Sequence, residues 1–176
     1  LQEDDYIVRA LKSHNYTVNY ESLIQFSSVD FECPTDAKWL FFSSKNGVKY
    51  FFRSAISNLK SETKIAAINQ GTAQALFELG FKVDFIGSGN DLQKIATDFD
   101  EIASGRIIFP QAKKSMQSIQ KNMKKNVDVG ALIVYENKPK SEIEKREEHI
   151  LIFTSPLSVE AYFSKYQQEN FQHIIS

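Results

Sequence analysis

The stretch AKWLFFSSKNGVKYFF, residues 37–52, decides the fold class. It begins with an almost continuous apolar run, residues 37–43, which is typical of a strand buried on both faces of a parallel sheet. A helix is predicted to begin at Ser44, because apolar residues then recur at helical spacing. The apolar side of this helix is formed by Val48, Phe51, Phe52 and Ile56. A buried strand that turns directly into an amphipathic helix indicates an α/β protein.

The rest of the chain repeats this alternation of short apolar strands and helices. Strands are predicted at 16–20, 65–68, 81–86, 106–109, 127–135, 150–153 and 173–176. Helices are predicted at 1–14, 73–79, 92–99, 111–123 and 155–166, with Gly80 and Asp91 as helix caps. Because the apolar runs are short, the pattern favours two modest parallel sheets covered by helices. Since Leu1 already lies in a predicted helix and Ser176 in a predicted strand, we expect further residues beyond both ends.

Composition excludes several classes of function. The 176 residues include 21 Lys and Arg against 22 Asp and Glu, so the chain lacks the basic excess of a nucleic-acid-binding protein. The single cysteine, Cys33, forms no internal disulfide, and the three histidines show no metal-ligand spacing. No apolar run approaches the roughly 20 residues that span a bilayer, and no signal peptide is visible. We therefore expect a cytoplasmic protein with no metal site, membrane or nucleic-acid partner.

Two segments of the chain are similar to each other. FSSKNGVKYFF, residues 42–52, matches FTSPLSVEAYF, residues 153–163, at an offset of 111. Upstream, LIQF at 23–26 matches LIVY at 132–135 at an offset of 109. One interpretation is that the match has no further meaning, because all turns from a buried strand to a helix have similar sequences. The other is that the chain contains two similar α/β units and crosses between them twice.

The second interpretation predicts two similar flavodoxin-like domains with parallel sheets, joined by a two-stranded linker. Domain 1 would be discontinuous, with residues 1–22 and 142–176, and domain 2 would contain residues 37–131. The linkers would be residues 23–36 and 132–141. Such a double connection acts as a hinge and predicts a cleft between the domains, where ligands often bind.

Three predicted turns from strand to helix can bind anions: Ser43–Gly47, Asn69–Thr72 and Thr154–Ser158. Each leaves backbone N–H groups unpaired at a helix start, where the helix dipole also favours negative charge. Hydroxyls are added by Ser44, Thr72 and Ser155, whereas Gly47, Gly71 and Ser158 are small. The alternative is plain N-capping. None of the turns matches a known phosphate-binding loop, because GxGxxG and GxxxxGK[ST] are both absent.

Two further features also have two interpretations. Tyr135 ends an apolar strand at a predicted crossing, where it either packs or presents its hydroxyl to the cleft as a weak acid. A cluster of lysines after the strand at 106–109 forms either a solvated helix face or a patch that steers anions toward the protein. Its members are Lys113, Lys114, Lys121, Lys124 and Lys125.

Four segments in order resemble the uroporphyrinogen-III synthase family. They are FFSSKNGVKYFF (41–52), KIAAINQGTAQALFELGFKVDFIG (64–87), LIVY (132–135) and IFTSPLSVEAYF (152–163). The resemblance implies an enzyme that closes hydroxymethylbilane to uroporphyrinogen III, with loss of water and inversion of ring D through a spiro intermediate. It implies a small-molecule substrate with eight carboxylates, no cofactor and a monomer. It also implies a further IGPTTA-like turn beyond Ser176.

The resemblance also implies roles for individual residues. Tyr135 matches the tyrosine proposed as proton donor to the departing hydroxyl. The implied substrate-binding residues are Ser43, Ser44, Lys45, Gln70, Gly71, Thr72, Ser155, Pro156 and Ser158. The chain departs from the family at Asn69, where glycine is common, and at Gln111–Lys113, where Gly-Asn is common.

Two other functions compete with this one. A non-enzymatic binding protein could clamp an anionic metabolite between two lobes. A regulatory domain of the response-regulator type would need acidic residues at strand ends, where this chain has Ser, Asn and Pro.

Overall fold

The computed structural model describes residues 5–55, 60, 62–123, 127–148, 150–166 and 173–175. The chain divides into two compact units. Unit 1 contains Leu1–Phe26 and Lys138–Ser176, and unit 2 contains Ser27–Asn137. The chain passes from one unit to the other within strands β1 (Ile24–Ser28) and β6 (Val129–Pro139).

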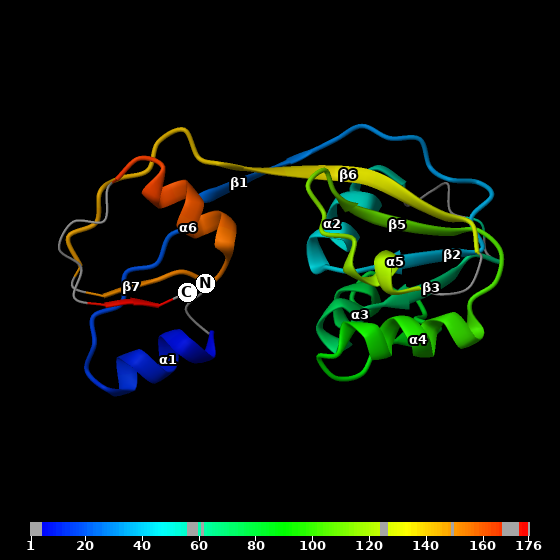
Figure 1. The fold of residues 1–176 in the computed structure, drawn as a ribbon, viewed down its shortest axis with the longest axis horizontal. Coiled ribbons are helices and arrows are strands. Elements are labelled where there is room, and N and C mark those ends of the chain that lie inside the picture. Colours follow the sequence, from blue (N-terminus) through cyan, green and yellow to red (C-terminus); the bar gives the residue numbers. More distant parts are fainter. Residues whose placement is uncertain are drawn as a thin grey trace. The chain divides into compact units, whose positions relative to one another are not determined.

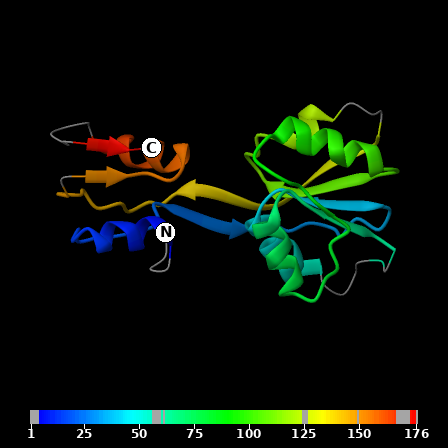
Figure 2. The ribbon, with the colours of Figure 1, turned by 90° about the horizontal axis from the view of Figure 1, so that it is seen from below.

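The largest sheet has six strands in the order β1-β6-β5-β2-β3-β4. Its remaining strands are β2 (Trp39–Phe42), β3 (Lys64–Ala67), β4 (Phe85–Ile86) and β5 (Ile107–Ala112). All pairs from β6 to β4 are parallel, whereas β1 runs antiparallel to β6 (Figure 2). A mixed α/β protein with a predominantly parallel sheet, as the sequence predicts, is thus confirmed.

Alternate residues of β2 build the two faces of this sheet. Leu40 and Phe42 pack with helices α2 (Lys45–Ala55) and α3 (Gln70–Phe77). Trp39 and Phe41 pack with helices α4 (Leu92–Ile102) and α5 (Ser118–Asn122). Figure 2 shows these two helix pairs on opposite faces of the sheet. All four side chains of β2 are at most 2% exposed, as expected for a strand covered on both faces.

Aromatic contacts dominate both faces of β2. On one face, the ring of Phe41 lies 4.9 Å from Phe99 and 5.0 Å from Phe109. On the other face, the ring of Phe42 lies 5.6 Å from both Phe51 and Phe52. Aromatic pairs of this kind contribute about 0.5–1.5 kcal/mol each beyond the area that they bury, so they stabilise the packing of α2 and α4 on the sheet and of β2 beside β5.

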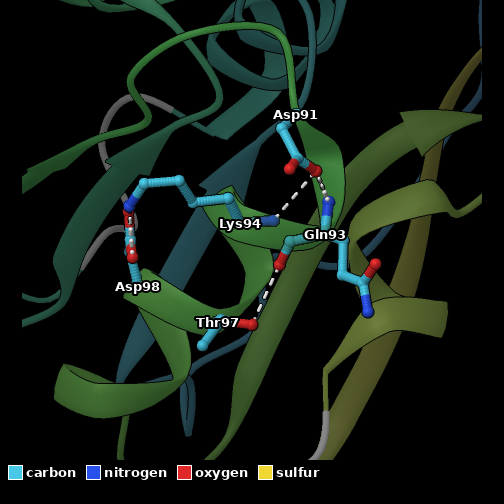
Figure 3. A network of polar contacts seen from close by, with 5 residues as sticks. All are labelled: Asp91, Gln93, Lys94, Thr97 and Asp98. Carbon is cyan, nitrogen blue, oxygen red and sulfur yellow. Dashed lines mark hydrogen bonds and ion pairs between the residues drawn. The ribbon is translucent and has the colours of Figure 1, made fainter.

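Both predicted helix caps of unit 2 are confirmed. The Asp91 carboxylate accepts hydrogen bonds from the backbone N–H groups of Gln93 and Lys94, at 2.9 and 3.1 Å (Figure 3). Gly80 follows α3 with φ +82°, and its N–H donates to the carbonyl of Phe77. A positive φ at this position is the usual end of a helix and favours glycine.

A second polar contact extends along the exposed side of α4. The ammonium group of Lys94 pairs with Asp98, four residues further on, at 2.7 Å (Figure 3). This hydrogen bond raises the pKa of Lys94 above its usual value. The hydroxyl of Thr97 donates to the carbonyl of Gln93 at 3.0 Å. These contacts occupy the polar groups of this helix start within the helix itself.

Unit 1 has a smaller core. It contains α1 (Tyr6–Ser13), β7 (Ile150–Ile152), α6 (Pro156–Phe163) and β8 (His173–Ile175) (Figure 1). Strands β7 and β8 form a parallel pair. Its core cluster contains the buried side chains Ile24, Ile143, Phe153, Ala161 and Tyr162, and Val8 of α1 is buried as well. The hydroxyl of Tyr162 accepts a hydrogen bond from the Arg146 N–H at 2.9 Å, which attaches the preceding loop to α6.

Three sequence-based predictions are wrong. The strand predicted over residues 81–86 is limited to β4, Phe85–Ile86. Residues 16–20 form no strand, and Tyr16 is 53% exposed. The helix predicted over residues 111–123 shrinks to α5, because β5 continues through Pro110 in parallel pairing with β6. Other positions used in the predictions lie outside the described residues: 1–4, Ile56, Lys124, Lys125 and Ser176.

Candidate functional site

Two of the predicted anion-binding turns are neighbours at the carboxyl edge of the unit 2 sheet. Strands β2 and β3 are parallel and aligned from Trp39↔Lys64 to Phe42↔Ala67. The turns that follow them therefore end at the same edge of the sheet. The Lys45 side chain reaches across, with its Cε 3.5 Å from the position that a Cβ of Gly71 would occupy. Lys45 thus brings a positive charge to the start of α3.

The start of α2 is fixed by a close contact with β5. The Ser44 hydroxyl accepts a hydrogen bond from the Gly47 N–H at 3.0 Å and so caps the helix. A Cβ on Gly47 would lie 2.8 Å from the carbonyl oxygen of Pro110, closer than two such atoms can approach. Glycine is therefore required here because the helix backbone lies directly against the strand.

The start of α3 is capped by Asn69, whose side-chain oxygen accepts from the Thr72 N–H at 2.9 Å. Thr72 is only 2% exposed, so its side chain belongs to the interior more than to the surface of the turn. Gln70 is exposed and Gly71 is half-buried. Within the described part of the chain, no hydrogen bond uses the amide N–H of Gln70 or Gly71. N-capping therefore uses one backbone amide at the start of α3, and the amides of Gln70 and Gly71 remain open to a ligand.

Tyr135 lies beside the start of α2. It is 7% exposed, and its hydroxyl oxygen lies 3.5 Å from the Ser44 hydroxyl oxygen. Its ring stacks on the ring of Tyr50, with centroids 5.2 Å apart and planes at 20°. The register between β5 and β6 shifts at Gln111 and Ala112, and Ala112 pairs with Tyr135. The structure therefore brings together the predicted proton donor and one of the predicted substrate-binding hydroxyls.

The third turn belongs to unit 1. Ser155 caps α6 by accepting from the Ser158 N–H at 3.2 Å, and the two hydroxyl oxygens lie 2.8 Å apart. Pro156 occupies the first turn, where its missing N–H costs nothing. A cavity of about 760 Å³ within unit 1 is lined by α1, residues 16–21 and β7, and it is bordered by Thr154 and Ser158.

One residue at this edge, Tyr50, is not singled out by the sequence pattern. The apolar spacing of α2 predicts Val48 and Phe51 as core residues, whereas a tyrosine among apolar residues has no distinct predicted role. The available signal was its position three residues after Gly47, which places both on the side of the helix that faces β5 and β6.

Titratable and metal-binding groups contribute little to this edge. In the described ranges, no group of three or more His, Cys, Asp and Glu side chains could hold a metal ion. Burial raises the pKa of the Cys33 thiol, which packs beside the core of unit 2. No helix in those ranges is long and apolar enough to cross a membrane. The polar groups at the edge are therefore mainly hydroxyls, backbone amides and the Lys45 ammonium.

The fold and this edge define an open α/β protein with a mainly parallel sheet, a class in which ligands bind at the carboxyl ends of the strands. The family model HEM4, described as uroporphyrinogen-III synthase HemD, matches residues 5–175. The chain therefore belongs to the uroporphyrinogen-III synthase family, whose enzyme acts in the biosynthesis of tetrapyrroles and heme.

Solved structures of the same family share the fold. The uroporphyrinogen-III synthetase of Helicobacter pylori is 24% identical with a TM-score of 0.69, over 87% of this chain and 75% of that one. A mutant uroporphyrinogen III synthase from Thermus thermophilus is 13% identical with a TM-score of 0.53, over 93% of this chain and 73% of that one. No curated protein matches the sequence significantly.

The contact at Gly47 leads to a test of stability. Gly47→Ala is expected to lower the free energy of unfolding by about 1–3 kcal/mol, because the new Cβ forces α2 away from Pro110. Gly71→Ala is the matched control, since its nearest neighbour is the flexible Lys45 side chain at 3.5 Å. It is expected to leave the stability unchanged or to raise it by up to about 1 kcal/mol. Urea unfolding of both variants measures the difference, and equal effects would contradict the explanation.

Proposed function

We propose that this chain is a lyase that cyclises hydroxymethylbilane to uroporphyrinogen III, with loss of water and inversion of ring D through a spiro intermediate. The observation that carries the proposal is the family match over residues 5–175. The hydroxyls and open amides at the carboxyl edge of unit 2 support it, because they suit a substrate rich in carboxylates. We propose that the enzyme acts as a cytoplasmic monomer without a cofactor.

The cyclisation of hydroxymethylbilane depends more on the orientation of the substrate than on strong acids or bases in the enzyme. The linear substrate closes readily by itself, but to the isomer in which ring D is not inverted. The enzyme must therefore hold the substrate so that only the inverting closure lies within reach, which is catalysis by orientation. Neutral donors on a rigid edge can hold several carboxylates without burying a formal charge.

The proposed architecture consists of two flavodoxin-like domains with a cleft between them. Domain 1 would contain residues 1–22 and 142–176, and domain 2 residues 37–131. The linkers would be residues 23–36 and 132–141. Support comes from the division of the chain into two compact units and from its two passages between them, in β1 and β6.

Each site residue has a role in this proposal. Tyr135 donates a proton to the departing hydroxyl of the substrate, and the Ser44 hydroxyl at 3.5 Å helps to orient it. The remaining residues form the turns that hold the acetate and propionate groups through hydroxyls, amides and the Lys45 ammonium; Pro156, which has no N–H, shapes its turn without donating. They are Ser43, Ser44, Lys45, Gln70, Gly71, Thr72, Ser155, Pro156 and Ser158. Because Thr72 is buried and its N–H donates to Asn69, we assign it the role of holding the turn in place for the neighbouring amides.

The isomer composition of the product tests the proposed function. Incubated with hydroxymethylbilane, the chain is expected to yield uroporphyrinogen III well above the amount formed without protein. Chromatography of the oxidised products separates isomers I and III. A product mixture identical to that of the uncatalysed reaction, from a folded protein that binds the substrate, would instead favour the non-enzymatic binding protein.

The role of Tyr135 is tested by Tyr135→Phe. This change removes the proton donor and retains the ring, so kcat is expected to fall about tenfold, below the usual contribution of a general acid. Binding of uroporphyrinogen III should change little, because the ring still fills its place. Tyr6→Phe is the matched control, since Tyr6 is 81% exposed on α1. An unchanged kcat for Tyr135→Phe in a coupled assay would refute the assignment.

Binding at the helix starts is tested by NMR. Titration with uroporphyrinogen III is expected to shift the backbone amide signals of Ser44, Gln70, Gly71 and Ser155. The amides of Gln93 and Lys94 serve as the control, because they also begin a helix but already donate to Asp91. If the first group stays unmoved at saturation, these turns do not hold the carboxylates.

A further inference from the structure

We infer that Tyr50 is a positioning residue that holds the Tyr135 hydroxyl in place. This inference rests on the proposed role of Tyr135. The two rings are stacked, with centroids 5.2 Å apart and planes at 20°, and Tyr50 is 6% exposed. Tyr50 comes from α2 and Tyr135 from β6, so the stack joins two elements that are distant in sequence.

Tyr50 is itself held firmly. It lies one turn after Gly47, where α2 meets the Pro110 carbonyl. The guanidinium of Arg53 lies 5.3 Å and the ammonium of Lys49 lies 5.7 Å from the centroid of the Tyr50 ring. Cations at this distance are attracted to an aromatic face and restrict its motion.

The stack limits the positions that the Tyr135 hydroxyl can occupy. A tyrosine on a strand has more than one favourable χ1 rotamer, and leaving the present one would break the contact with Tyr50. In the observed rotamer, the hydroxyl lies 3.5 Å from the Ser44 oxygen. Ser44 is fixed in turn by the hydrogen bond that it accepts from Gly47. Helix α2 therefore fixes both the ring and the hydroxyl of Tyr135.

This role requires the flat ring of Tyr50 and not its hydroxyl. Tyr50→Phe retains the stack and is expected to keep kcat within about twofold of the native value. Tyr50→Leu removes the ring, frees Tyr135 to leave its position, and is expected to lower kcat about tenfold. The KM for hydroxymethylbilane should change little, because the role of Tyr50 is exerted through Tyr135.

A double-mutant cycle on the full chain tests the inference. It compares the native protein, Tyr50→Leu, Tyr135→Phe and the double variant by kcat. If Tyr50 acts through the Tyr135 hydroxyl, Tyr50→Leu has no further effect on kcat once Tyr135→Phe is present. Phe52→Leu is the matched control, since Phe52 is a buried aromatic of the same helix that stacks on Phe42 and Phe81. It is expected to lower stability and to leave kcat unchanged.

The outcomes separate the inference from the function on which it rests. An unchanged kcat in Tyr135→Phe overturns the proposed proton donor. A lower kcat in Tyr135→Phe, together with an undiminished effect of Tyr50→Leu in the double variant, overturns only the role of Tyr50. A tenfold loss in Tyr50→Phe also overturns it, because the ring is still present. Circular dichroism verifies folding, and Tyr50→Met, whose flexible side chain adapts better to the space left by the ring, replaces Tyr50→Leu in the cycle if the latter does not fold.

Discussion

The close approach of α2 to β5 at Gly47 is the constraint on which the candidate site depends. Any side chain at this position would meet the carbonyl of Pro110. Because the helix can lie this close, the cap residue Ser44 comes within 3.5 Å of the Tyr135 hydroxyl. One turn further on, the same helix places Tyr50 against the ring of Tyr135. A small shift of α2 would therefore change every one of these contacts together.

The edge of unit 2 also explains how a chain with a net charge of −1 can suit a polyanion. Backbone amides at a helix start carry partial positive charge and need no counter-ion when the site is empty. At α3, the Asn69 cap uses the amide of Thr72 and leaves those of Gln70 and Gly71 open. Lys45 adds a full charge close to Gly71, where the exposed position keeps its desolvation cost low. In the proposed site, affinity for carboxylates would thus arise from local arrangement and not from overall charge.

The elements that the sequence predicts well are those with strong local patterns. The buried run at residues 37–43 predicts β2, and the glycine and aspartate at positions 80 and 91 correctly mark helix ends. Elsewhere, tertiary pairing overrides local signals. Proline at 110 suggests the end of a strand, but β5 continues because it lies beside β6. The stacking of Tyr50 on Tyr135 depends on the register between two strands and a helix, which no local pattern contains.

The two similar turns of the chain illustrate what such a match in sequence means physically. Ser44 and Ser155 both cap a helix by accepting from the N–H three residues later, at Gly47 and Ser158. The shared requirement for a cap therefore explains why serine occurs at the same place in both turns. The residue that donates differs, however. Gly47 must lack a side chain because a strand carbonyl lies against it, whereas the Ser158 hydroxyl has room to contact Ser155 at 2.8 Å. Capping thus accounts for the serine that the two turns share, and the difference at the donor residue shows where a helix start is pressed against its sheet.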